Sequence, residues 1–220
     1  MPAAQNYKEF ISKLPKAVKL VVVSKTKTPE EILEIYNAGQ RFFGENKVQE
    51  LVEKQETLPK DIEWHMIGHL QTNKVKYIAP FVALIQSVDS IKLLKTINKE
   101  AVKNQRIIPC LIQIYIAQEE TKYGLYLEEA AELLSSEEFA TLKNVEIRGV
   151  MGMATFTENF EQIRQEFKNL KNIFELLKKK YFAQQPEFSE ISMGMSDDYI
   201  VAIKEGSTIV RIGSAIFGSR

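Results

Sequence analysis

The sequence has little cysteine, no charge imbalance and no long apolar run. Among its 220 residues Cys110 is the single cysteine, which excludes an internal disulfide and a cysteine-based zinc site. We therefore expect a reducing compartment. Lysine plus arginine number 29 and aspartate plus glutamate also number 29, so the formal net charge is zero. Because a dedicated nucleic-acid-binding protein usually carries a basic surface, we expect no nucleic-acid partner.

Membrane and export signals are also lacking. The longest apolar runs, such as residues 21–23, fall far short of the roughly 18 residues that cross a bilayer. The N-terminus lacks the apolar core and the cleavage site of a signal peptide. It shows instead an apolar face at helical spacing, formed by Tyr7, Phe10, Ile11 and Leu14. We expect no membrane association and a cytoplasmic location.

Several common active-site motifs are absent. The chain contains no GxSxG elbow, no P-loop and no GxGxxG, which removes the usual signatures of hydrolases, NTPases and dinucleotide enzymes. His65 and His69 have the i, i+4 spacing that suits a metal on a helix, but they fall on a predicted strand and its following loop, ~13 Å apart. We therefore expect no metal site. Cys110, within an apolar strand, is expected to be a buried small hydrophobe.

What the sequence does contain is a repeated alternation of short β-branched runs with segments of helical period. The first strand is predicted at 19–25, and Thr28 suits the N-cap of the helix that follows, with Gly39 at its C-terminal end. Further strands are predicted at 42–44, 62–67, 82–86, 107–116, 145–151, 189–193 and 208–212. Helices are predicted at 47–55, 73–78, 90–103, 127–134, 160–179 and 197–204, with a short turn at 214–217.

This alternation predicts the fold class. Strands that are joined by helical crossovers pair in parallel and are covered on both faces. Eight strand–helix units predict an α/β protein built as a closed (β/α)₈ TIM-type barrel, with an extra N-terminal helix over residues 1–16 packed on it. We expect a single domain over residues 1–220. An open doubly wound sheet is the alternative that fits the same alternation.

The first candidate functional residue is Lys25, at the end of the first strand. In a barrel the functional groups lie at the C-terminal ends of the strands and in the loops that follow. Burial at a strand end disfavours the charged form of a lysine, and nearby Lys27 would add to this effect. An uncharged lysine amine can attack an aldehyde and form a Schiff base. The alternative is a lysine that extends into solvent or pairs with a carboxylate.

The loops after the seventh and eighth strands are the second candidate, because barrels often bind a phosphate there. Gly194 and Gly213 permit a close approach of the backbone, and Ser196 and Ser214 supply hydroxyl groups. The alternative is that Ser196 merely caps the next helix.

Arg211, at the end of the last strand, is the third candidate. It would place a positive charge in the barrel mouth, where a ring nitrogen or a carboxylate of a ligand could meet it. The alternative is an ion pair with Glu205 or Asp197, and the sequence alone leaves both interpretations open.

Five segments together resemble one protein family. They read VVVSKTK, FFGENKVQE, WHMIGHLQTNKVKYI, IRGVMGMATF and ISMGMSDDYIVAIKEGSTIVRIGSAIFG. These segments closely resemble the pyridoxal phosphate homeostasis proteins, a family similar to the barrel domain of alanine racemase. The resemblance runs from about Lys19 to Gly218. His69 departs from the family pattern, in which proline is more usual at this position.

The resemblance implies pyridoxal 5′-phosphate as cofactor and a set of residues that bind it. Lys25 matches the lysine that holds the cofactor as an internal aldimine, and Arg211 matches the arginine that faces the pyridine nitrogen. Asn46 matches a residue near the cofactor. The phosphate-binding loops of the family are matched by Ser196, Gly213 and Ser214.

The resemblance also implies a role without efficient turnover. An arginine at the ring nitrogen disfavours its protonation, which makes the ring a weaker electron sink. Racemases with such a ring use a tyrosine from a second domain, and we expect no room for that domain in a chain that ends at Arg220. The implied role is to hold, buffer or deliver pyridoxal phosphate, with apo forms of pyridoxal-phosphate enzymes as recipients.

Two alternatives stay open at this stage. One is a small pyridoxal-phosphate-dependent racemase or lyase that uses Tyr115, Tyr123 or Lys27 as its second proton carrier. The other is an interaction module without a cofactor. Because the sequence shows no long exposed apolar stripe, we expect a monomer.

Overall fold

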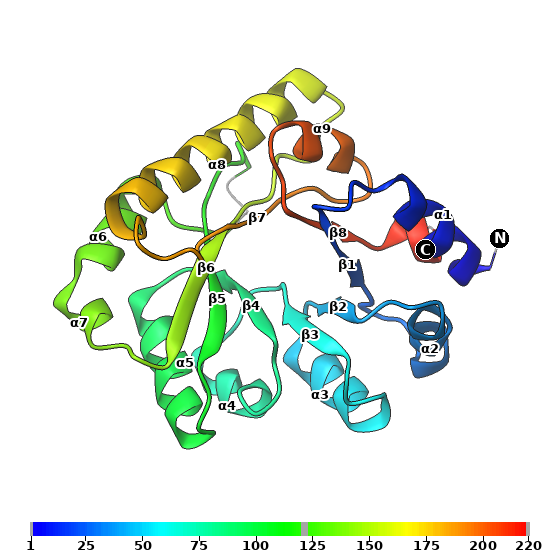
Figure 1. The fold of residues 1–220 in the computed structure, drawn as a ribbon, viewed down its shortest axis with the longest axis horizontal. Coiled ribbons are helices and arrows are strands. Elements are labelled where there is room, and N and C mark those ends of the chain that lie inside the picture. Colours follow the sequence, from blue (N-terminus) through cyan, green and yellow to red (C-terminus); the bar gives the residue numbers. More distant parts are fainter. Residues whose placement is uncertain (1, 120–122, 219–220) are drawn as a thin grey trace.

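The computed structural model describes residues 2–119 and 123–218. Within these ranges, eight parallel strands close into a barrel in chain order, and the last strand pairs back onto the first (Figure 1). The closed barrel confirms the (β/α)₈ prediction, and the open-sheet alternative is wrong. The strands are β1 (Lys19–Val23), β2 (Phe42–Glu45), β3 (Glu63–Met66), β4 (Leu84–Val88), β5 (Ile108–Gln113), β6 (Val145–Met151), β7 (Glu190–Ser192) and β8 (Ile209–Ile212).

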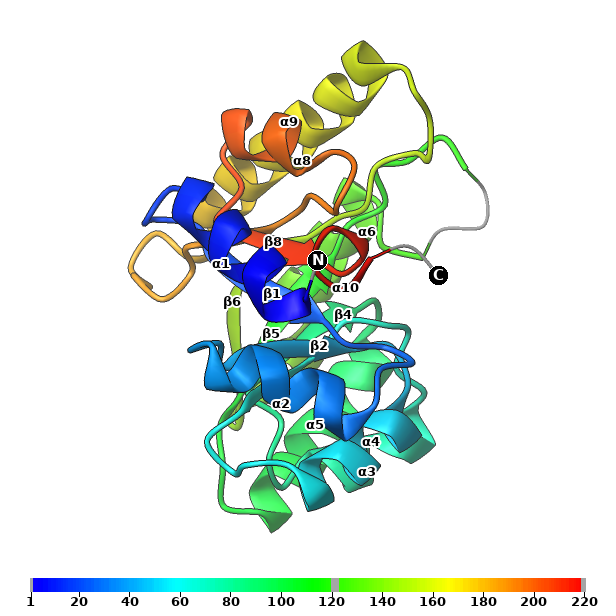
Figure 2. The ribbon, with the colours of Figure 1, turned by 90° about the vertical axis from the view of Figure 1, so that its right-hand side faces the viewer.

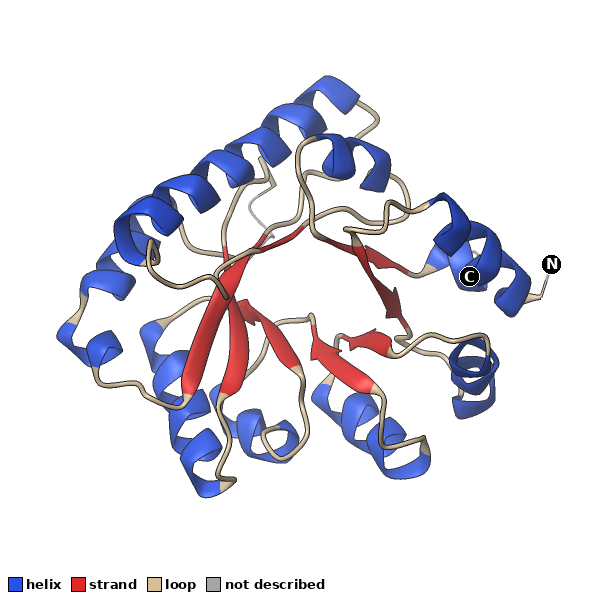
Figure 3. Ribbon diagram, in the orientation of Figure 1, coloured by secondary structure: helices blue, strands red, loops and turns tan. Residues whose placement is uncertain are grey.

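Helices surround the strands on the outside of the barrel (Figure 3). They are α1 (Ala3–Lys13), α2 (Pro29–Asn37), α3 (Val48–Thr57), the 3₁₀ turn η1 (Thr72–Lys74), α4 (Val75–Ile78), α5 (Ile91–Lys103), α6 (Leu127–Ser135), α7 (Glu137–Ala140), α8 (Phe160–Tyr181), α9 (Tyr199–Lys204) and α10 (Ser214–Phe217). The sequence did not predict α7, a single turn that begins where the Ser136 hydroxyl accepts from the Phe139 N–H at 3.1 Å. Among the described residues, no helix is long and apolar enough to cross a membrane.

The ends of α2 were predicted correctly. The Thr28 hydroxyl accepts from the Glu31 N–H at 3.3 Å, while the Glu31 carboxylate accepts from the Thr28 N–H at 2.8 Å, which completes a capping box. Gly39, just beyond the helix, has φ +111°, a conformation that favours glycine. The capping box fixes where the loop between β1 and α2 ends, and that loop carries Lys25.

Two apolar clusters hold the barrel together. The larger one lies between the strands and the surrounding helices. The smaller one lies inside the barrel and consists of Val21, Leu84, Leu111, Met151 and Ile209. Side chains two residues apart point to the same side of a strand, so Arg211 follows Ile209 on the inner side. The barrel therefore contains an apolar layer with polar groups further along the same strands.

The N-terminal helix α1 packs against α2 and α10 near the seam between β1 and β8 (Figure 2). Tyr7 is buried there, and the Asn6 amide donates to the Ile216 carbonyl at 2.9 Å. The helix expected over residues 1–16 thus spans Ala3–Lys13 and supports α10, the element that follows Arg211.

Candidate functional site

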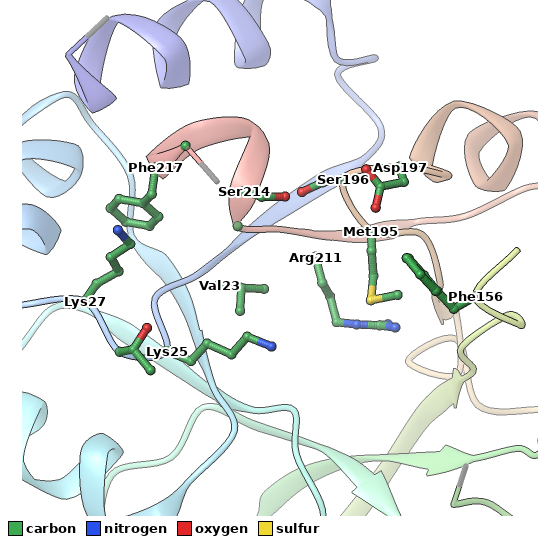
Figure 4. Close-up of a pocket in the computed structure, with 13 residues that line it drawn as sticks. Val23, Lys25, Lys27, Phe156, Met195, Ser196, Asp197, Arg211, Ser214 and Phe217 are labelled. Carbon is green, nitrogen blue, oxygen red and sulfur yellow. The ribbon is translucent and has the colours of Figure 1, made fainter. Parts of the chain in front are cut away.

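A cavity of about 410 Å³ opens where β1 and β8 end, in the range of small-molecule sites of about 300–1,000 Å³ (Figure 4). Five of the six predicted site residues line it, namely Lys25, Ser196, Arg211, Gly213 and Ser214. The other lining residues are Val23, Thr26, Lys27, Phe156, Met195, Asp197, Phe217 and Gly218. The structure thus brings together groups that are almost 200 residues apart in the chain.

Asn46 is the predicted residue that does not join this cavity. It follows β2 and is half-buried, and it lines a separate hollow of about 200 Å³ together with His69 and Lys74. Because β2 is the neighbour of β1 in the barrel, Asn46 lies close to the end of β1, but it does not line the cavity that contains Lys25 and Arg211.

Lys25 lies in a loop rather than on a strand. We expected a buried strand end, but β1 ends at Val23 and the Lys25 side chain is exposed, so the expected desolvation by burial is wrong. Within residues 2–119 and 123–218, Lys25 forms no hydrogen bond or ion pair. Lys27, in contrast, pairs with Glu31 at 3.0 Å and lies over the Phe217 ring. Of the two lysines in the cavity, Lys25 is the one whose amine is available.

The loop at Lys25 is held in a strained turn. The Lys27 N–H donates to the Ser24 carbonyl at 3.0 Å, and Thr26 between them has φ +63°. A β-branched residue in this left-handed region costs on the order of 1–2 kcal/mol. The Glu50 carboxylate of α3 accepts from the Thr26 N–H at 2.7 Å and so stabilises the turn. No local sequence signal predicted this contact.

Arg211 is buried at the base of the cavity. Its guanidinium donates to the Ser192 hydroxyl at 2.6 Å and to the Gly152 carbonyl at 3.1 Å. The alternative of an ion pair with Glu205 or Asp197 is wrong: Glu205 pairs with Arg164 instead, at 3.1 Å. Burial lowers the pKa of Arg211 to about 10, while the negative charge of Asp198 acts in the opposite direction and raises it. Arg211 therefore stays a cation at neutral pH.

A chain of hydrogen bonds leads from Arg211 across the inside of the barrel. The Ser192 hydroxyl accepts from Arg211, so its proton is donated to the Gln86 carbonyl oxygen at 2.6 Å. The Gln86 amide nitrogen in turn donates to His65 Nδ1 at 2.8 Å. These directions make His65 an acceptor at Nδ1 and therefore neutral. Sequence reasoning missed this chain because its members lie on β8, β7, β4 and β3, which only the closed barrel brings together.

The burial of His65 gives a testable dependence of stability on pH. Burial, with a smaller contribution from the Lys19 charge, lowers the pKa of His65 from 6.5 to about 3. Between these pH values the unfolded chain binds a proton that the folded protein does not. The contribution of His65 to the free energy of unfolding is therefore fully present above pH 6.5 and is lost as the pH falls toward 3. The loss is up to about 1.4 kcal/mol per pH unit.

We expect the His65→Gln variant to lack this contribution. Urea unfolding of both proteins at about pH 6.5 and about pH 4.5 measures the effect, because the difference in unfolding free energy between wild type and variant should shrink at the lower pH. An unchanged difference would contradict a neutral, buried His65.

The two predicted phosphate loops are joined to each other. The Ser196 hydroxyl accepts from the Ala215 N–H at 3.3 Å, so Ser196 links the loop after β7 to α10 and does not cap α9. Figure 4 shows Ser196 and Ser214 side by side at the rim of the cavity. A Cβ atom on Gly213 would lie 3.3 Å from the Val23 carbonyl, so glycine permits this close packing against β1.

The charges around the cavity favour an anionic ligand. Three cationic side chains, Lys25, Lys27 and Arg211, face one lining carboxylate, Asp197. The described residues contain no group of three or more His, Cys, Asp or Glu side chains that could hold a metal ion. Cys110 is buried, as predicted, and burial raises the pKa of its thiol.

The tyrosines that the enzyme alternative would use lie elsewhere. Tyr123 stacks on the His69 ring with a centroid distance of 4.4 Å, and the Tyr115 hydroxyl donates to the Glu119 carbonyl at 2.7 Å. Neither tyrosine is among the described residues that line the cavity.

Comparison with known proteins identifies the family. The sequence model of the family described as alanine racemase, N-terminal domain, matches residues 3–220. A pyridoxal phosphate homeostasis protein of Aquifex aeolicus is 45% identical over 203 residues, covering 92% of this chain and 87% of that protein. This chain belongs to the pyridoxal phosphate homeostasis protein family. Another member of the family, from Haemophilus influenzae, is 41% identical over 206 residues, covering 92% of this chain and 85% of its own length.

Solved structures place the homeostasis-protein fold among known barrels. PipY of Synechococcus elongatus, solved with PLP bound, is 33% identical with a TM-score of 0.88, over 98% of this chain and 100% of PipY. Alanine racemase from Bartonella henselae is 16% identical with a TM-score of 0.74, over 99% of this chain and 58% of the racemase, and so shares the fold alone.

Proposed function

We propose that this protein acts in pyridoxal phosphate homeostasis as a single barrel domain that holds the cofactor as a Schiff base on Lys25, with little or no catalytic turnover. The observation that carries the proposal is the meeting of Lys25, whose amine has no partner among the described residues, with the buried Arg211 cation in one cavity. The PLP-bound structure of PipY supports the choice of ligand.

The residues of the cavity fit this cofactor. Pyridoxal phosphate supplies an aldehyde that condenses with an amine, with loss of water, to form an imine. Lys25 would provide that amine, and Arg211 would face the ring nitrogen and disfavour its protonation. The phosphate would be held by Ser196, Gly213 and Ser214. Asn46 stays outside this set because it lines a different hollow.

The same geometry favours holding the cofactor over enzymatic turnover. A racemase needs a second acid–base group beside the substrate carbon, and of the three candidates for it only Lys27 lines the cavity. Lys27 is engaged by Glu31. We propose that a cytoplasmic monomer buffers pyridoxal phosphate and delivers it to apo enzymes, in keeping with relatives that are named homeostasis proteins.

The test combines spectroscopy with isotope exchange. Pyridoxal phosphate added to the purified protein should produce the visible absorbance of an imine, and borohydride should trap one adduct that peptide mapping assigns to Lys25. A panel of amino acids in deuterium oxide should then acquire no deuterium at Cα above the level of free pyridoxal phosphate. Steady deuterium incorporation would favour the racemase or lyase alternative, and the lack of any adduct would overturn cofactor binding through Lys25.

A further inference from the structure

A buried ion pair lies directly beneath the turn that carries Lys25. Lys54 on α3 is 6% exposed and Glu45 at the end of β2 is fully buried. The Lys54 ammonium donates to the Glu45 carboxylate at 2.7 Å and to the Ser24 carbonyl at 2.8 Å. The Ser24 hydroxyl donates to the same carboxylate oxygen at 2.6 Å. The residue before Lys25 is thus held through both its backbone and its side chain.

The residue after Lys25 is held by the same helix. Glu50 lies one helical turn before Lys54, so their side chains share one face of α3. The Glu50 carboxylate accepts from the Thr26 N–H at 2.7 Å and lies 3.4 Å from the Lys54 ammonium. Hydrogen bonds from α3 therefore fix the backbone on either side of Lys25.

Stability alone does not account for this arrangement. A buried ion pair is often no better for stability than apolar residues of similar volume, because both charges must be desolvated. Among the described residues the Glu45 carboxylate also has one buried oxygen without a hydrogen-bond partner, which is a further cost. The contacts are directional, however, and they converge on a turn in which Thr26 has φ +63°. Directional contacts of this kind hold a backbone in one conformation.

We propose that Glu45, Glu50 and Lys54 are positioning residues that keep Lys25 directed into the cavity. Figure 4 shows the Lys25 side chain extending from the turn toward Arg211, whereas Lys27 extends to Phe217. Holding the turn keeps the Lys25 amine where an aldehyde can reach it, while the phosphate loops bind independently of α3. The inference rests on the proposed function of Lys25 toward pyridoxal phosphate.

The test separates covalent from non-covalent binding in the Glu50→Ala variant. Stopped-flow absorbance with pyridoxal phosphate should show imine formation slowed at least about tenfold, since a misplacement of about 1 Å can cost a factor of about 100. Binding of pyridoxine 5′-phosphate, which carries an alcohol in place of the aldehyde, should be unchanged. Glu50→Gln should restore most of the rate because its amide oxygen can still accept from the Thr26 N–H. Glu53→Ala, at an exposed position of α3, is the matched control and should behave as wild type.

A second measurement does not depend on the cofactor. Hydrogen exchange read by mass spectrometry should show faster exchange in the peptide that contains residues 24–27 for Glu50→Ala, and not for Glu50→Gln or Glu53→Ala. A wild-type rate of imine formation in Glu50→Ala would overturn the positioning role while leaving the proposed function intact. A wild-type protein that traps no adduct at Lys25 would overturn the proposed function, and unchanged exchange in residues 24–27 would still refute the positioning role on its own.

Discussion

Replacing Lys25 by alanine is expected to abolish the borohydride-trapped adduct of pyridoxal phosphate completely. Lys25 supplies the one cavity amine without a partner among the described residues. In its absence the remaining cavity amine, on Lys27, is paired with Glu31 and is not available to condense with the aldehyde. Mass spectrometry of the reduced protein should detect no added mass at a stoichiometric dose of cofactor. The phosphate loops and Arg211 remain in this variant, so it should still bind pyridoxine 5′-phosphate.

Lys27→Ala is the matched control for this experiment. Lys27 lines the same cavity two residues further along, but its ammonium pairs with Glu31 and lies over the Phe217 ring. The variant should therefore keep a stoichiometric adduct at Lys25. A full adduct in Lys25→Ala, or loss of the adduct in Lys27→Ala alone, would show that the aldehyde condenses with an amine other than that of Lys25.

Replacing Gly149 by alanine is expected to have the largest effect on folding. A Cβ atom at this position would lie 1.8 Å from the Glu190 carbonyl oxygen on β7, and Gly149 has φ +151°. Neither backbone can move aside without breaking the pairing of β6 with β7, in which Gly149 faces Glu190. We expect a loss of more than about 4 kcal/mol in the free energy of unfolding, measured by urea denaturation.

Gly39→Ala separates the steric clash from backbone strain. Gly39 has φ +111°, but a Cβ atom there would meet nothing within 4 Å. Its substitution should cost only the strain of the conformation, on the order of 1–3 kcal/mol. Equal losses in the two variants would mean that β7 yields to the added methyl group and that the close approach at Gly149 is unimportant.

Gly149 also connects stability to the site. The register between β5 and β6 shifts between Cys110 and Leu111, so that Leu111 pairs with Gly149. This irregularity precedes Gly152, whose carbonyl accepts from Arg211. The path of β6 thus sets the position of one of the two groups that hold the guanidinium.

The fold could be predicted from the sequence because each strand and helix has a local cause. Runs of β-branched residues between helical segments recur along the whole chain, and signals such as the capping box at Thr28 mark where a helix begins. Strand ends were less predictable. The run of apolar residues before Lys25 does not reveal that the chain leaves the sheet at Val23, so the predicted burial of Lys25 was wrong.

The site could be predicted in part for a similar reason. Lys25, Arg211 and the two loops follow strands directly, and a barrel gathers strand ends at one face. The groups that hold them could not be predicted. Ser192, Gln86 and Lys54 look like isolated polar residues in the sequence, and their partners are set by the closure of the barrel and by the packing of α3 on β2.

The direction of the hydrogen bonds inside the barrel limits what can rest against its polar layer. Ser192 and Gln86 each donate a proton to the next residue toward His65. The N–H groups of Arg211 that make no contact within the barrel are therefore the only hydrogen-bonding groups that this series of four residues can present to the cavity. A ligand edge with a lone pair is matched there, whereas an edge that carries its own proton would set donor against donor. The buried guanidinium should therefore favour a ligand that carries no proton on the edge facing it, while Ser192, Gln86 and His65, which do not line the cavity, hold the guanidinium in place from behind.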